Sequence, residues 1–130
     1  MKVLFAGGMV VLSLGLFLGV SSAGEKGKKA EPKYTIKEVM EKAHSDGGLL
    51  EKVSEGTASA QEKKQLVEMY VALNSNKPPR GDKAKWAKLT QSLVDAAKAV
   101  DAGKGEKAVK SLEMVTNCKN CHSQFKPLKN

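Results

Sequence analysis

The sequence predicts an all-α protein, arranged as an antiparallel four-helix bundle, over residues 34–130. From Tyr34 onward the apolar residues recur at the spacing of a buried helix face, and no stretch has the pattern of a strand. Two capping boxes, each a Ser or Thr followed three residues later by Glu, mark helix starts at Thr35 and Ser59. Amphipathic helices with short connections bury their apolar stripes by packing as a bundle.

The first two helices follow these capping boxes. We expect the first to run from Thr35 to the Gly47-Gly48 pair, because adjacent glycines end a helix. Its apolar stripe is Ile36, Val39, Met40 and Ala43. A short apolar turn is expected at residues 49–53, and the second helix then runs from Ser59 to about Asn74. Its expected inward face is Leu66, Val67, Tyr70, Val71 and Leu73.

The third and fourth helices complete the bundle. Residues 75–82 contain two adjacent prolines, which exclude a helix, and Asp82 is a suitable cap for the helix that follows. Its stripe is Trp86, Leu89, Leu93, Ala96, Ala97 and Val100. After Gly103 a last, continuous helix of about 20 residues is expected from Glu106 to Pro127. The residues expected on one face of this helix are Ala108, Leu112, Val115, Cys118, Cys121, His122 and Phe125.

The first 33 residues are expected to lie outside this domain. Residues 1–23 have the pattern of a signal peptide: Lys2, an apolar run of 18 residues, and small residues that end at Ala23. Cleavage after about Ala23 is expected, and retention of the run as a membrane anchor is the alternative. Residues 24–33 are polar and contain Gly and Pro, which predicts a flexible linker.

The sequence Cys118-Lys119-Asn120-Cys121-His122 is the strongest functional signal. It is the attachment pattern of a c-type haem, and it contains both cysteines of the chain. Each thiol adds to one vinyl group of the porphyrin, and the histidine binds the iron as proximal ligand. On a helix these residues stand at i, i+3 and i+4, on one face. We therefore expect one covalent haem c per chain.

Three other interpretations of these residues are weaker. A structural zinc site needs a second cluster of Cys or His, which the sequence lacks. A thioredoxin-like dithiol lies at a helix N-terminus after a strand, whereas this pair is expected late in a helix of a protein without strands. A disulfide between Cys118 and Cys121 would close only a very short loop.

With this motif near the end of a four-helix chain, the sequence resembles the class II cytochromes c, the cytochrome c-prime family. The run from Cys118 to Lys126, with Phe125 three residues after the histidine, is similar to the C-terminal signature of that family. The resemblance implies attachment of haem in the periplasm and either of two states of the iron. Low-spin members bind it with a methionine of the first helix. High-spin members leave that position open and bind nitric oxide or carbon monoxide.

The distal ligand decides between these two states. Met40 lies where the family has its first-helix residue, so we expect it to be the distal ligand. His44, one turn later, is an alternative ligand, and an open site with Met40 as core filler is another. Met69 falls between the expected apolar positions of its helix, and Met114 shares a helix with the cysteines, so neither is a good candidate.

Three aromatic residues are expected to form the core or the haem pocket. Tyr70 and Trp86 are the large aromatics of the second and third helices, and Phe125 is in phase with His122.

The sequence therefore predicts an exported, periplasmic one-electron carrier, and a gas-binding protein is the alternative function. No acid–base pair for an enzyme such as a peroxidase is evident. The formal net charge of +8 favours an acidic redox partner and also allows association with an anionic membrane surface. Nucleic acid is not expected, since no motif interleaves aromatic and basic residues. The family resemblance implies a monomer or a homodimer.

Overall fold

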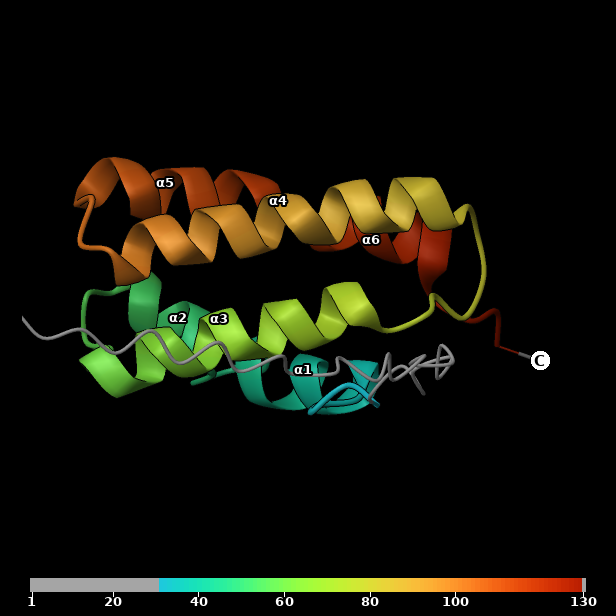
Figure 1. Ribbon diagram of the computed structural model, residues 1–130, viewed down its shortest axis with the longest axis horizontal. Helices are drawn as coiled ribbons and strands as arrows, with labels where there is room; N and C mark the ends of the chain where they lie inside the picture. Colours follow the sequence, from blue (N-terminus) through green and yellow to red (C-terminus); the bar gives the residue numbers. More distant parts are fainter. Residues whose placement is uncertain (1–30, 130) are drawn as a thin grey trace, which may run out of the picture. The chain divides into compact units, whose positions relative to one another are not determined.

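The computed structural model describes residues 31–129, and this part of the chain is all-helical (Figure 1). The signal peptide expected at residues 1–23 and most of the linker expected at 24–33 lie outside the described residues. Within the described part, no helix is both long enough and apolar enough to cross a membrane. The helices are α1 (Ile36–Ala43), α2 (Leu49–Ser54), α3 (Ala60–Ser75), α4 (Lys83–Asp101), α5 (Glu106–Val115) and α6 (Cys118–Phe125).

Both predicted capping boxes are present. The Thr35 hydroxyl accepts a hydrogen bond from the Glu38 backbone N–H at 3.2 Å, and the Glu38 carboxylate accepts one from the Thr35 N–H at 2.8 Å. Ser59 and Glu62 repeat these contacts at the start of α3. Each box satisfies two backbone N–H groups that a helix start otherwise leaves without partners.

The two longest helices, α3 and α4, pack against each other along the middle of the domain (Figure 1). Helices α1 and α2 pack against α3, and α5 packs against α4. The largest wholly buried side chains come from α1 to α5: Val39, Val53, Leu66, Met69, Tyr70, Leu73, Thr90 and Leu112. The core therefore lies between these five helices.

Two details of the predicted helices are wrong. The turn expected at residues 49–53 is a helix, α2, with Leu49 and Val53 buried. In α3, Val71 is 44 % exposed and Met69 is wholly buried. The buried stripe of α3 follows the spacing i, i+3, i+4, i+7 from Leu66, which includes Met69 and passes over Val71.

The continuous last helix is also a wrong prediction, because the chain breaks between α5 and α6. Thr116 ends α5, and its hydroxyl donates hydrogen bonds to the carbonyl oxygens of Leu112 and Glu113. The Asn117 side chain then accepts the Asn120 backbone N–H at 2.9 Å and caps α6. Thr and Asn compete with helical backbone hydrogen bonds in this way, so two polar residues divide the predicted helix.

Acid stability should depend on Glu62. The Lys52 ammonium, 2.6 Å away, and the Ser59 N–H lower the pKa of Glu62 to about 2 from 4.5. A carboxyl with a depressed folded pKa contributes stability above its unfolded pKa, and this contribution is lost as the pH falls through the folded pKa. Melting temperatures measured from pH 5 to about pH 2 should therefore fall less steeply for Glu62→Gln, and also for Lys52→Met, than for the wild type. Parallel curves for all three proteins would contradict this assignment.

Candidate functional site

The Cys-x-x-Cys-His segment occupies the first five residues of α6, directly after the Asn117 cap. Cys118, Cys121 and His122 all line one cavity, as the i, i+3, i+4 spacing predicts for one helix face. The break before α6 corrects one argument from the sequence: Cys118 is at a helix N-terminus, as in dithiol redox enzymes. The strand of those enzymes is absent from the part of the chain that the structure describes.

The two thiols differ from each other in exposure. Both cysteines are free, Cys118 exposed and Cys121 half-buried. Burial, and to a smaller extent the neighbouring Cys118, raises the pKa of the Cys121 thiol. This raised pKa keeps the Cys121 thiol protonated at neutral pH.

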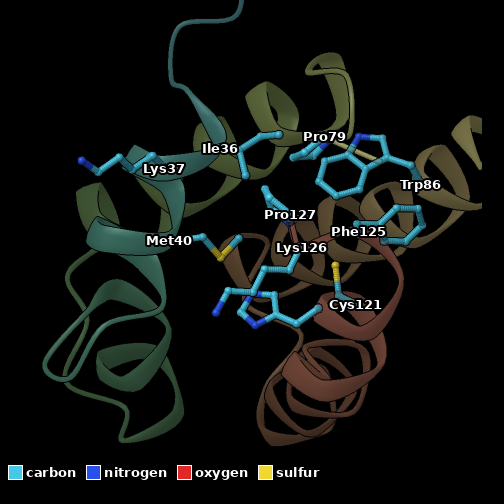
Figure 2. Close-up of a pocket in the computed structure, with 10 residues that line it drawn as sticks. Ile36, Lys37, Met40, Pro79, Trp86, Cys121, Phe125, Lys126 and Pro127 are labelled. Carbon is cyan, nitrogen blue, oxygen red and sulfur yellow. The ribbon is translucent and has the colours of Figure 1, made fainter. Parts of the chain in front are cut away.

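Two cavities adjoin the face of α6 that carries Cys121 and His122, and the larger, about 480 Å³, lies between α1 and α6 (Figure 2). This volume is in the range of cofactor sites. In Figure 2 the Met40 side chain extends from α1 toward the cavity, and the Cys121 sulfur, Phe125 and Trp86 lie on the opposite side. The lining residues are Ile36, Lys37, Met40, Pro79, Trp86, Cys121, His122, Phe125, Lys126 and Pro127.

The smaller cavity, about 170 Å³, continues from the same residues toward the start of α6. It shares Met40, Cys121 and His122 with the larger cavity. The remaining lining residues are His44, Leu73, Leu93, Val115, Thr116, Asn117 and Cys118. The two cavities together give α6 an apolar hollow along its cysteine-bearing face.

The structure brings both predicted distal ligands to this hollow. Met40 is half-buried and lines both cavities, whereas His44 lines only the smaller one. Burial lowers the pKa of His44, and the nearby His122 lowers it further, so the imidazole is held in its neutral form. Met69 is wholly buried in the core and Met114 is 74 % exposed, and neither lines the cavities.

The three predicted aromatic residues have different positions. Trp86 and Phe125 both line the larger cavity and pack edge to face, with ring centroids 5.2 Å apart. The Trp86 indole N–H donates to the Asn76 carbonyl oxygen at 2.9 Å, which fixes the ring. Tyr70 lines neither cavity and is wholly buried, with its ring centroid 5.6 Å from that of His44.

The connection that holds α6 in place is not predictable from the sequence pattern. The Arg80 guanidinium donates to the Lys126 carbonyl oxygen at 2.6 Å and to the Ser123 carbonyl oxygen at 2.7 Å. These are carbonyls of the last turn of α6, which have no partner within the helix. Next to Arg80, Gly81 has a φ of 86°, and a Cβ there would lie 2.8 Å from the Gln124 carbonyl oxygen. The Arg-Gly pair is visible in the sequence, but its partners lie more than 40 residues away.

Replacing Gly81 by Ala should displace α6. A left-handed backbone with a Cβ costs about 1–2 kcal/mol, and the clash with the backbone of Gln124 and the ring of Phe125 adds about 1–3 kcal/mol. Gly103→Ala is the matched control, because Gly103 has a φ of 73° and no atom within 4 Å of its added Cβ. Urea denaturation should show the larger loss for Gly81→Ala, and amide exchange should accelerate at residues 122–126 only in that variant. Equal losses and equal exchange would contradict the close approach.

No family model, curated protein or solved structure matches this chain. The functional interpretation therefore depends on the residues of the site and their geometry.

Proposed function

We propose that this protein is a periplasmic c-type cytochrome of the class II kind, which carries one electron through one covalently attached haem. The observation that carries the proposal is that Cys121, His122 and Met40 line the same cavities, with Cys118 beside them. Two thiols and an imidazole thus stand on one wall, and a thioether stands on the other. Thiol addition to vinyl groups and axial binding of iron by His and Met need these groups.

The all-helical fold of the described residues is also consistent with the proposal. The described residues are all-helical, and α1 packs on α3, α3 on α4 and α4 on α5. We propose that α1, α3, α4 and the broken pair α5–α6 act as the four members of an antiparallel bundle. Cofactor sites in bundles form between facing helices, and here the facing pair is α1 and α6.

Each residue of the site has a role in this proposal. Cys118 and Cys121 would hold the porphyrin through thioether bonds, and His122 would bind its iron. Met40 would be the second protein ligand of the iron, and the apolar rings of Trp86 and Phe125, which line the larger cavity, would exclude water from it. When bound, the haem supplies the Fe(II)/Fe(III) couple. Lys37 and Lys126 also line the larger cavity. Their ammonium groups would contribute positive charge next to the two propionate carboxylates of the haem.

The alternative function is binding of nitric oxide or carbon monoxide at an open distal position. Met40 lines both cavities together with apolar residues, which also fits a side chain that only fills space there. In this alternative Met40 packs against the ligand and does not bind the iron. His44 as distal ligand is a further alternative within the carrier function.

The charge of the protein supports an acidic redox partner. The chain has 22 basic and 14 acidic residues. A positive surface near the haem would speed association with an acidic protein and make it sensitive to salt. The same surface allows contact with anionic lipids, and the carrier would act as a monomer or a homodimer.

Covalent attachment is tested by mass spectrometry of the chain expressed with a periplasmic cytochrome-maturation system. The wild type should carry one haem that stays with the denatured polypeptide, because two thioether bonds join them. Cys118→Ala and Cys121→Ala should each retain at most one bond, and the double variant should release all haem to acid-acetone. Wild-type protein whose haem is extracted by acid-acetone would overturn the proposal.

Met40→Ala tests the carrier against the gas-binding alternative. We expect the wild type to have a low-spin absorption spectrum, and Met40→Ala to be high-spin and to bind carbon monoxide, since loss of the thioether opens a coordination position. Met114→Ala is the matched control, because the Met114 side chain is exposed and lines neither cavity. A wild type that is already high-spin favours gas binding. A change of spin state in His44→Ala alone would assign the distal position to His44.

A further inference from the structure

The charged residues of the described domain are unevenly distributed. Two segments, residues 83–94 in α4 and residues 117–129 in and around α6, contain six lysines and no acidic residue. The other residues between 31 and 129 contain 12 basic and 13 acidic side chains. The net positive charge of the domain therefore belongs to these two segments. Their lysines are Lys83, Lys85, Lys88, Lys119, Lys126 and Lys129.

These six lysines are available to a partner. All six are exposed, and none forms an ion pair with a described residue. The ion pairs of the described part of the chain join lysines of other segments to glutamates. An exposed ammonium group without a carboxylate partner keeps its full positive potential, which extends about 8 Å into a solution of physiological ionic strength. The two segments thus form a surface that attracts anionic groups.

The two segments meet at an open groove between α4 and α6, of about 250 Å³. Trp86 and Phe125 pack against each other where the helices meet, and Figure 1 shows α6 next to the first half of α4. Lys85 and Lys88 line the groove from α4. The groove therefore has two positive charges and no acidic side chain. Its other lining residues are Leu89, Ser92, Asn120 and Gln124.

The groove and the cavities lie on different faces of α6. Asn120 and Gln124 line the groove, whereas the two cysteines and His122 line the cavities, and no lining residue is shared. An α-helix with its side chains is about 10 Å across. A protein bound in the groove would thus be separated from a haem on the cysteines by the thickness of one helix, and would not need to enter the cavities.

We propose that the groove between α4 and α6 is the docking site of an acidic redox protein, whose carboxylates pair with the ammonium groups of Lys85 and Lys88. The inference rests on the proposed haem function and deepens it, because it specifies where the partner binds. The other four lysines of the two segments steer the approach of the partner.

The shape of the groove favours a protein over a lipid surface. Protein interfaces combine an apolar centre with a polar rim, and here Leu89 is half-buried among Ser92, Asn120 and Gln124. A protruding segment with carboxylate side chains can enter such a groove. The headgroups of a bilayer form a broad surface, which would contact the exposed lysines without filling the groove.

The test measures electron transfer to the haem-containing protein from a flavodoxin with an acidic surface, used as the probe. The flavin hydroquinone gives one electron to Fe(III), which leaves the flavin semiquinone and Fe(II). Lys85→Glu/Lys88→Glu should lower the second-order rate constant about tenfold at about 10 mM salt, because attraction becomes repulsion. The difference should nearly vanish at about 0.5 M salt, where the charges are screened.

Lys104→Glu/Lys107→Glu is the matched control. Both lysines are exposed, have the same spacing of three residues and line neither the groove nor the cavities. The net charge changes equally in the two double variants, so the control should change the rate constant less than about threefold. Both should keep the wild-type absorption spectrum. Lys85→Gln/Lys88→Gln, a milder change, should lower the rate constant in the same direction as the glutamate variant.

A second measurement does not depend on electron transfer. Backbone amide chemical shifts of the protein should change at residues 85–92 and 119–124 when oxidised flavodoxin is added. The dissociation constant from this titration should rise about tenfold for Lys85→Glu/Lys88→Glu and less than about threefold for the control. Shifts confined to other parts of the domain would contradict the docking site.

The outcomes separate this inference from the proposed function. If mass spectrometry finds no attached haem, the carrier function is overturned, and the redox role of the groove with it. If haem is attached and the two double variants react at equal rates, only the docking site is overturned. Vesicles of phosphatidylglycerol and phosphatidylcholine test a lipid surface. Binding to them that Lys85→Glu/Lys88→Glu abolishes, together with equal rates of electron transfer, would assign these lysines to the membrane and overturn the proposal.

Discussion

The site depends on how α6 is held against the rest of the domain. This helix has eight residues, and an isolated helix of that length is not stable in water. Three contacts fix it: Phe125 packs on the edge of Trp86, Arg80 bonds to the last carbonyls, and Gly81 lets the chain approach the backbone of Gln124. Residues 76–86 therefore hold α6 in place. The orientation of α6 in turn sets the direction in which Cys121 and His122 point.

The wall of the cavities that faces α6 includes residues of α1. Met40 and His44 stand one turn apart on α1, whose other face is anchored by Val39 and Ala43 against α3. A cavity of about 480 Å³ lies between α1 and α6 and is lined by residues of both helices. A domain of this size buries a small core, so a large apolar cofactor in that space would add substantially to its stability.

The two cavities differ in the polarity of their lining residues, and this difference is relevant to both proposed functions. The wall of Trp86 and Phe125 around the larger cavity is apolar, and a thioether from Met40 would suit an iron that changes charge without changing ligands. The lining of the smaller cavity includes the polar residues His44, Thr116 and Asn117. The two proposed functions differ in the role of one side chain, Met40, which lines both cavities.

The sequence by itself determined the helical class, the capped helix starts at Thr35 and Ser59, and the common face of Cys118, Cys121 and His122. These features depend on residues three or four apart, and such local patterns are readable without tertiary contacts. The sequence did not reveal the break at Thr116 and Asn117, since both residues are compatible with a helix until their side chains bond to the backbone. Only the tertiary contacts show that Arg80 and Gly81 hold α6, and that the rings of Tyr70 and His44 lie together. Those contacts join residues 26 to 46 positions apart, and no local spacing encodes which distant partners meet.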